Sequence, residues 1–205
     1  WRLLYSFERL VRETLPDIVS MENVPNLIHE NVFRDFVRTL NELHYEVEYQ
    51  VVNCPDYGVP QHRKRLVLLA SRFGEIHLIP PLYDAEHYIT VRDAIGHLQP
   101  IEAGEICPDD ILHRSSALSA INMERIQQSV PGGTWRDWDE SLRLKCHRKE
   151  SGATFPSVYG RMEWDEPSPT MTTQFYGYGN GRFGHPEQNR AISLREGAIL
   201  QSFPD

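Results

Sequence analysis

The order of apolar patterns over the first seventy residues limits the fold most narrowly. Apolar side chains recur at helical spacing from Leu3 to Leu15, and Pro16 ends that segment. A second helical stripe runs from Val32 to Leu43, and strand-like runs occupy residues 17–21, 45–52 and 66–70. Helix, strand, helix, strand and strand is the order expected for part of an α/β sheet, and we expect its buried strands to be parallel.

The regular helix and strand patterns of the sequence give way beyond about residue 75. Prolines become frequent, and the one clear helix signal runs from Thr90 to Ile95. We therefore predict a domain boundary near residue 99, with residues 100–185 forming an irregular region of loops and small strands. Regularity returns at Ser193-Leu194-Arg195-Glu196, a capping box that predicts a helix through Leu200.

Composition bounds the class of protein. The chain has 205 residues, of which 40% are hydrophobic, and three cysteines. No apolar run approaches the roughly 18 residues that span a bilayer. An odd number of widely spaced cysteines argues against a disulfide framework and against a zinc site. These features predict a folded, intracellular protein with neither a membrane segment nor a metal.

The formal net charge of −8 argues against a protein whose whole surface binds nucleic acid. Two local basic runs remain, one at residues 62–65 with Arg72 and one from Arg143 to Lys149. On composition alone, such runs are more often solvated surface than binding sites. A local contact with nucleic acid therefore stays open.

Two polar constellations carry the chemistry. Glu22-Asn23-Val24-Pro25 follows a short strand, where side chains of an α/β sheet meet ligands, although such a glutamate is more often a solvated loop residue or a helix cap. Strand alternation places Gln61, Arg63 and Arg65 on one face, where the arginines need anionic partners. We predict that these three side chains converge with Glu22 on one polar cleft, with at least one of the two arginines within about 6 Å of Glu22. The alternative is a purely structural ion pair.

At these residues a resemblance becomes specific. Glu22-Asn23-Val24 after a strand, followed by the run from Asp56 to Arg65, resembles two ordered signature motifs of the DNA (cytosine-5) methyltransferases. The segment from Gly184 to Asp205 is similar to a third conserved block of that family. Residues 131–137 and 164–173 resemble the target-recognition region of its bacterial members. Several ordered blocks are far more specific than any single motif.

One further motif is a decoy. The segment from Gly179 to Gly184 matches the dinucleotide-binding glycine pattern by letter, but His185-Pro186 follows where that pattern needs a helix. We predict a glycine-rich loop. In the resembled family this stretch lies near DNA, which glycine backbone can approach closely.

The resemblance implies an architecture and partners. Residues 1–99 would be the C-terminal half of a Rossmann-like methyltransferase sheet within the catalytic domain, and residues 100–205 a small, mostly β and loop target-recognition domain with the closing helix. The implied partner is double-stranded DNA and the implied cofactor of the complete enzyme is S-adenosyl-L-methionine. A monomer in the bacterial cytoplasm, associated with the nucleoid when on DNA, is expected.

The resemblance also assigns roles. The family flips a cytosine out of the duplex, because carbon 5 cannot be reached in the stack, and a thiolate then attacks carbon 6. Glu22 matches the glutamate that holds or protonates ring nitrogen 3, and Arg63 and Arg65 match arginines that orient it and meet base oxygen or phosphate. Asn23 would brace the loop, and Gln61 completes the predicted catalytic set.

The recognition region supplies the predicted DNA contacts. Cations suit phosphates, whereas Thr and Gln suit base edges. Thr170-Met171 matches a Thr-aliphatic dipeptide that the family places beside the flipped base, although a β-branched packing strand is the alternative. The full predicted set is Arg136, Arg143, Lys145, Arg148, Thr170, Met171, Thr172, Gln174 and Tyr176.

The nucleophile is where the chain departs from the family pattern. The family's cysteine stands in a Pro-Cys dipeptide upstream of Glu-Asn-Val, whereas Cys54, Cys107 and Cys146 follow asparagine, isoleucine and lysine. We therefore expect a fragment that cannot transfer a methyl group alone, and no residue is assigned to the cofactor. A catalytically inactive DNA-binding module and a purely structural interaction protein are the alternatives.

Overall fold

The computed structural model describes residues 2–149 and 154–204, and these form two compact units. The first unit comprises Trp1–Tyr57 and Arg63–Leu82, and the second comprises Gly58–His62 and Tyr83–Asp205. The chain thus passes into the second unit for five residues, returns, and leaves the first unit after Leu82. The domain boundary expected near residue 99 stays a prediction.

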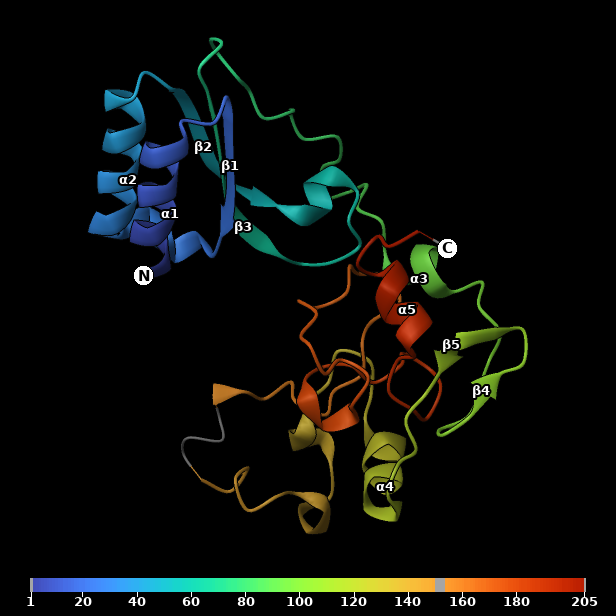
Figure 1. Ribbon diagram of the computed structural model, residues 1–205. Helices are drawn as coiled ribbons and strands as arrows, with labels where there is room; N and C mark the ends of the chain where they lie inside the picture. Colours follow the sequence, from blue (N-terminus) through green and yellow to red (C-terminus); the bar gives the residue numbers. More distant parts are fainter. Residues whose placement is uncertain (1, 150–153, 205) are drawn as a thin grey trace. The chain divides into compact units, whose positions relative to one another are not determined.

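The first unit is a three-stranded sheet with two helices on one face (Figure 1). Helices α1 (Arg2–Thr14) and α2 (Asn31–Glu42) lie side by side over strands β1 (Ile18–Asn23), β2 (Glu46–Asn53) and β3 (Lys64–Ser71). Short 3-10 helices, η1 (Pro25–His29) and η2 (Cys54–Tyr57), follow β1 and β2. The predicted helices and strands are all present, so the mixed α/β class is confirmed.

The predicted parallel pairing is wrong. The strand order is β1-β3-β2, and β3 is antiparallel to both of its neighbours. The segment between β2 and β3 contains only η2 and loop, without the crossover helix that a parallel pair needs. Strands β1 and β2, which α2 does connect, run parallel to one another but flank β3 rather than pairing.

Strand alternation decides which side chains face the helices. Val19 and Met21 of β1 and Leu66, Leu68 and Ala70 of β3 are buried in one core with the aromatic and aliphatic stripe of the two helices. Each large aliphatic side chain in such a core contributes about 1.5–3 kcal/mol. The same alternation turns Glu22 and Arg65 to the opposite face of the sheet.

The second unit has short elements joined by long irregular segments, as expected for this region. They are α3 (Val91–Ile95), β4 (Ile106–Cys107), β5 (Asp110–Arg114), α4 (Ala120–Gln128), η3 (Trp135–Asp137), η4 (Glu140–Leu142), η6 (Tyr178–Asn180) and α5 (Leu194–Ile199). The predicted capping box at Ser193 and Glu196 is present, and Thr90 and Asp93 form another. Helix α4 was not predicted, because its buried side chains are only Arg125 and Ile126.

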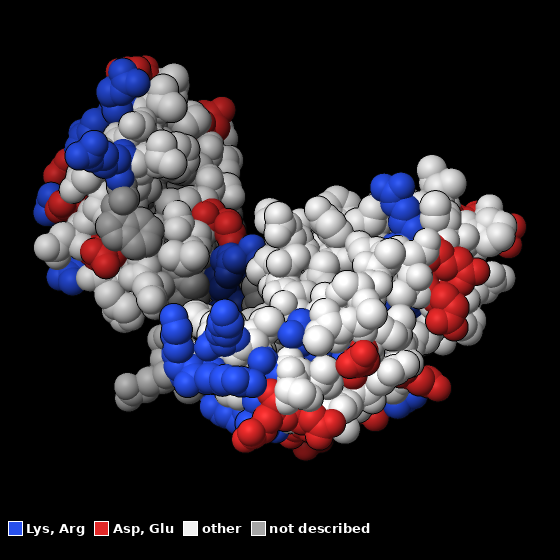
Figure 2. Space-filling model, turned by 90° about the horizontal axis from the view of Figure 1, so that it is seen from below, with Lys and Arg blue, Asp and Glu red and all other residues white. Residues whose placement is uncertain are grey.

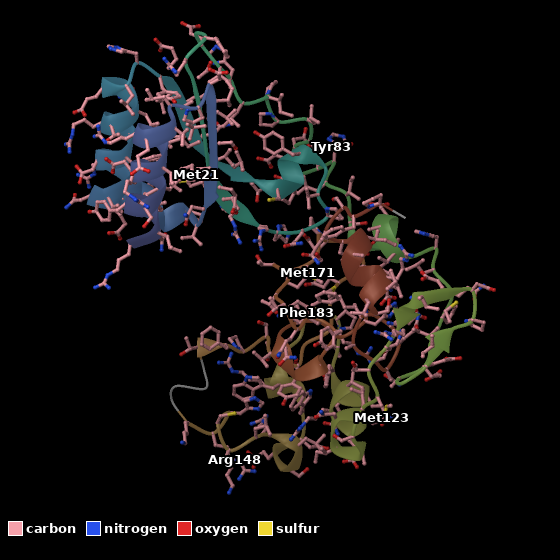
Figure 3. The ribbon with its side chains drawn as sticks, viewed as in Figure 1. Met21, Tyr83, Met123, Arg148, Met171 and Phe183 are labelled. Carbon is pink, nitrogen blue, oxygen red and sulfur yellow. The ribbon has the colours of Figure 1, made fainter. Side chains whose placement is uncertain are left out.

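Residues from distant parts of the sequence share the main core of this unit. Met162, Met171, Phe183 and Ile192 are buried together with residues of α3, and Figure 3 shows Met171 beside Phe183. The Gly179–Gly184 segment includes part of η6, and Gly184 then bridges Ala191 where a dinucleotide fold would continue as a helix. The predicted glycine-rich loop is confirmed.

The described residues hold neither a membrane-spanning helix nor a cluster of metal ligands. No helix among residues 2–149 and 154–204 has the length and apolar character needed to cross a bilayer. The same residues contain no group of three or more His, Cys, Asp or Glu side chains arranged to hold a metal ion.

Candidate functional site

Glu22 and Arg65 are diagonal neighbours on the face of the sheet opposite helices α1 and α2. Glu22 lies opposite Val67 in the β1–β3 register, and Arg65 lies two residues before Val67 on β3. Arg65 Nε donates to Glu22 Oε1 at 2.5 Å, and Arg65 Nη1 donates to the Lys64 carbonyl at 2.7 Å. The second bond fixes the guanidinium beside the carboxylate. The predicted proximity of Glu22 to an arginine is confirmed.

Solvent still reaches this carboxylate. The side chain of Glu22 is 56% exposed and that of Arg65 is 20% exposed. Arg65 occupies only Oε1, and Glu22 Oε2 bonds to no residue that the structure describes. Glu22 lies inside β1 rather than after it, so its orientation comes from strand pairing. One oxygen is held and one is available.

The neighbours of this pair are partly structural. Asn23 Oδ1 accepts a hydrogen bond from Val24 N at 2.9 Å, which braces the turn into η1. The Arg63 carbonyl accepts from Cys54 N at 2.8 Å, whereas its guanidinium bonds to none of the described residues. Burial raises the pKa of the Cys54 thiol, against the lowering effect of Arg63 and Arg65. A neutral, partly buried thiol is a poor nucleophile.

Gln61 has a bracing position in the second unit. Its side chain is buried, its Oε1 accepts from Met171 N at 3.0 Å, and its Nε2 donates to the Leu200 carbonyl at 3.3 Å. Strand β3 begins at Lys64, so Gln61 does not extend one strand face with the arginines as predicted. It pairs instead with Ser168 in an isolated parallel bridge. Its place in a cleft with Glu22 stays a prediction.

The Thr170-Met171 dipeptide is held by the same segment. Thr170 Oγ1 donates to the His62 carbonyl at 2.5 Å, while the Met171 side chain is buried in the core. Contact between DNA and the Met171 side chain would therefore require it to leave that core. Thr172, Gln174 and Tyr176 are exposed. Thr170, Thr172, Gln174 and Tyr176 are thus accessible.

The basic segment, residues 136–149, brings several cations together. Lys and Arg side chains gather on one part of the face shown in Figure 2. Arg136 and Arg143 both lie over the Trp135 ring, at 5.2 and 5.9 Å from its centroid. Arg143 Nη2 donates to the Arg136 carbonyl at 2.8 Å, which makes Arg143 partly structural.

The outer cations of this segment are more accessible. Arg136, Lys145, Arg148 and Lys149 are exposed, and Arg148 Nη2 donates to the Glu140 carbonyl at 3.0 Å. Figure 3 shows Arg148 projecting outward. These positions are suited to a polyanion such as the phosphates of DNA.

An aromatic cluster underlies the basic segment and was not predicted. His147 stacks on Trp135 with ring centroids 4.5 Å apart, and Trp138 and Tyr159 adjoin it. Burial lowers the pKa of His147, and the charges of Arg125 and Arg143 lower it further. The positive charge of the segment at neutral pH therefore comes from arginine and lysine alone. Its members lie up to 24 residues apart in the sequence, so no local sequence pattern could have predicted this cluster.

A buried ionic pair organises the C-terminal block. Arg190 Nη1 and Nη2 donate to the two oxygens of Glu196, each at 2.7 Å, and both residues are fully buried. Burial alone would raise the pKa of Glu196, but the hydrogen bonds from Arg190 hold it below its usual value. Glu196 Oε2 also accepts from Ser193 N, which closes the capping box of α5. His185 Nε2 lies 3.7 Å from Glu196 Oε1, and burial lowers the pKa of His185 to about 4.

Comparison with known proteins decides the family. A family model described as C-5 cytosine-specific DNA methylase matches residues 1–205. The chain belongs to this family. The resemblance inferred from the sequence motifs is therefore confirmed.

The bacterial relatives that this chain matches are longer than it is. It is 58% identical to the Type II methylase M.HgiDII of Herpetosiphon aurantiacus, over 100% of this chain and 58% of that protein. It is 33% identical to the Type II methyltransferase M1.BsuMI of Bacillus subtilis, over 99% of this chain and 47% of that protein. The chain thus spans about half the length of these relatives.

A solved structure supports the fold. A protein described as a DNA modification methyltransferase encoded within an E. coli prophage superposes on this chain with a TM-score of 0.66. The two share 21% sequence identity over 97% of this chain and 62% of the other. At that identity the likeness concerns the fold alone.

Proposed function

We propose that this chain forms part of a DNA (cytosine-5) methyltransferase. The proposed reaction transfers a methyl group from S-adenosyl-L-methionine to carbon 5 of a cytosine flipped out of a specific site in double-stranded DNA. The Glu22–Arg65 pair is the observation that carries the proposal, because it presents a held carboxylate with one oxygen unbonded by the described residues. Cytoplasmic location and a monomeric enzyme remain predictions.

Glu22 acts at ring nitrogen 3 of the base. Addition of a thiolate to carbon 6 builds negative charge on the ring, and a proton shared with nitrogen 3 stabilises it. Arg65 holds Oε1, so Oε2 is the atom that meets the base. Because Glu22 is 56% exposed in the chain, the flipped base itself must exclude water there. The thiolate is assigned to none of the three cysteines, none of which follows a proline.

The Glu22 site does not fit the methyl donor. S-adenosyl-L-methionine carries a positive sulfonium, and the Glu22–Arg65 ion pair, whose charges cancel, offers it no net negative charge. A carboxylate paired with arginine suits the polar edge of a base or a phosphate instead. We therefore assign no residue of this chain to the cofactor and derive no step through it.

The second unit supplies contacts to DNA. Exposed Arg136, Lys145 and Arg148 are placed to meet phosphates, with Arg143 bracing the segment through its bond to the Arg136 carbonyl. Thr170, Thr172 and Gln174 are the proposed contacts nearer the bases, and Tyr176 is a further proposed DNA contact. Met171, whose side chain is buried, positions this segment through its backbone bond to Gln61.

A chimera tests the proposal. The matching segment of the Herpetosiphon methylase is replaced by this chain, and tritium transfer to duplex DNA from labelled S-adenosyl-L-methionine is measured. The chimera should methylate DNA, and Glu22→Gln should lower the rate by about 10²–10⁴-fold, the usual contribution of an acid or base. Glu46→Gln, an exposed carboxylate on β2 of the same sheet, is the matched control and should leave the rate unchanged.

Two results would contradict the proposal. Equal rates for Glu22→Gln and the unsubstituted chimera would remove Glu22 from the chemistry. A folded chimera that binds duplex DNA but transfers no tritium would favour the DNA-binding module without catalysis.

A further inference from the structure

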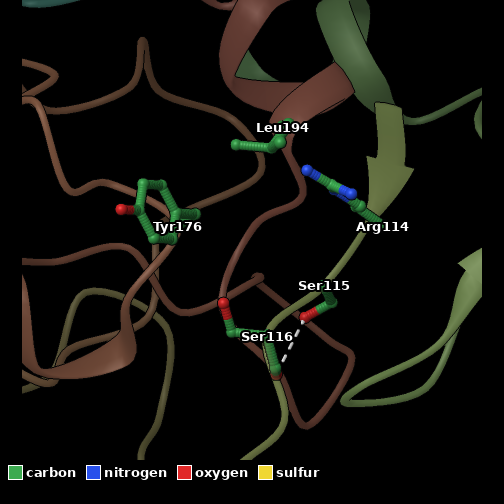
Figure 4. Close-up of a pocket in the computed structure, with 5 residues that line it drawn as sticks. All are labelled: Arg114, Ser115, Ser116, Tyr176 and Leu194. Atoms are coloured by element: carbon green, nitrogen blue, oxygen red, sulfur yellow. Dashed lines mark hydrogen bonds between the residues drawn. The ribbon is translucent and has the colours of Figure 1, made fainter. Parts of the chain in front are cut away.

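A pocket of about 460 Å³ lies in the second unit, apart from the residues assigned above except Tyr176. Its lining consists of Arg114, Ser115, Ser116, Tyr176 and Leu194. In Figure 4 the guanidinium of Arg114 and the hydroxyl of Ser116 point into the space between the Tyr176 ring and Leu194. Arg114 is the last residue of β5, and Leu194 is the first of α5.

The charge of this pocket is uncompensated. Arg114 is the only charged residue of the lining, and its guanidinium bonds to none of the described residues. Two nearby carboxylates are already paired: Asp110 of β5 accepts from Arg195 at 2.5 and 3.3 Å, and Glu196 is held by Arg190. The ligand that such a lining favours is therefore an anion.

The walls of the pocket are held in place from both sides. Ser115 Oγ donates to the Ala191 carbonyl at 3.1 Å, so the segment after β5 is tied to the buried C-terminal block. On the other side, an added Cβ on Gly197 would lie 2.1 Å from the Phe175 ring, which shows how closely that ring packs on α5. Phe175 then contacts the Tyr176 ring edge to face at 5.9 Å. The segment that carries Ser116 and the aromatic wall of the pocket are thus held in place before a ligand binds, and the exposed Arg114 side chain extends from the end of β5.

We propose that this pocket binds a backbone phosphate of duplex DNA. Arg114 donates to phosphate oxygens and the Ser116 hydroxyl adds a neutral donor, while the Tyr176 ring and Leu194 pack against the deoxyribose. This site rests on the proposed function, since it requires the chain to bind DNA. It adds a phosphate contact on β5 that neither the sequence motifs nor the basic segment indicated.

Salt-dependent binding tests the site. The 205-residue chain is titrated into fluorescently labelled duplexes of several sequences at 50 to 200 mM salt. Arg114→Gln should weaken binding to every duplex by about three- to tenfold and reduce the slope of log K against log salt by about 0.9, the loss of one phosphate contact. Arg114→Lys keeps the charge and should restore most of the slope.

Arg34→Gln is the matched control. It removes one positive charge from the exposed face of α2 in the first unit, where its described contact is the His29 carbonyl. If it reproduced the Arg114→Gln effect, net charge rather than a local contact would be responsible, and the site would be refuted.

The remaining outcomes separate the site from the proposed function. Unchanged affinity and slope in Arg114→Gln would overturn the phosphate site while leaving DNA binding intact. Loss of preference among duplex sequences in both Arg114→Gln and Arg114→Lys, with the slope preserved, would overturn it in favour of base recognition. Absence of binding by the unsubstituted chain would overturn the site together with the DNA-binding part of the proposed function.

Discussion

Removing Arg190 while keeping Glu196 should strongly destabilise the second unit. In Arg190→Met, the carboxylate keeps one described backbone donor, Ser193 N at 2.6 Å, and loses two charge-assisted bonds of 2.7 Å. Breaking a buried pair in this way costs about 3–5 kcal/mol, because a charge remains without its partner. Glu196→Gln should cost less, since Arg190 retains the carbonyls of Ile101 and Ala191 and the Gln188 side chain.

The pH dependence of the Arg190→Met deficit has a definite sign. Without the guanidinium, burial should raise the pKa of Glu196 in the folded state above that in the unfolded state. The folded state then binds more protons than the unfolded state, so stability falls as pH rises through that window. The deficit relative to the unsubstituted chain should be largest near pH 8 and shrink toward pH 5.

Urea unfolding followed by tryptophan fluorescence measures these differences. Trp135, Trp138 and Trp164 all lie in the second unit, and a Trp1→Phe background removes the remaining tryptophan. The double variant Arg190→Met with Glu196→Gln should be more stable than Arg190→Met alone. Equal costs for the two single variants within about 0.5 kcal/mol, together with a deficit independent of pH, would refute the reasoning.

Two further predictions concern the same unit. Stability should rise with pH between about 4 and 6.5, because burial lowers the pKa of His185 to about 4 and only the unfolded imidazole is protonated in that window. The free energy of unfolding should change by about 3 kcal/mol across that window, and the urea midpoint of His185→Asn should not show this rise with pH. Gly197→Ala should cost about 1–3 kcal/mol, because the added methyl group would force Phe175 away from α5. Ala198→Gly, at the next position of that helix, is the control and should cost less than about 1 kcal/mol. Similar thermal midpoints for the two variants would contradict that packing.

Local patterns predicted the elements well and their pairing poorly. Periodicity located α1, α2 and the three strands, and the Ser193–Glu196 box located α5, because each signal lies within one segment. Strand direction depends on how segments meet, and alternation alone does not carry that information. The antiparallel β3 was therefore missed, although alternation still placed Arg65 on the face of Glu22.

The candidate site divides along the same line. Glu22 and Arg65 were predictable because both belong to ordered motifs. Gln61 was placed on the wrong element, since its bonds reach Met171 and Leu200, more than 100 residues away. Arg114 gave no signal in the sequence, because a single arginine at a strand end is ordinary until a pocket forms around it.

The excursion of Gly58–His62 into the second unit limits how this protein can be recombined. The backbone passes between the units after Tyr57, after His62 and after Leu82, so no single cut separates them. Suppose that residues 83–205 alone were grafted into a related enzyme to change its DNA specificity. A residue of that enzyme would then have to replace Gln61, which here bonds Met171 N and the Leu200 carbonyl. We therefore expect a transferred recognition region to fold correctly in another enzyme only when its own Gly58–His62 segment is transferred with it.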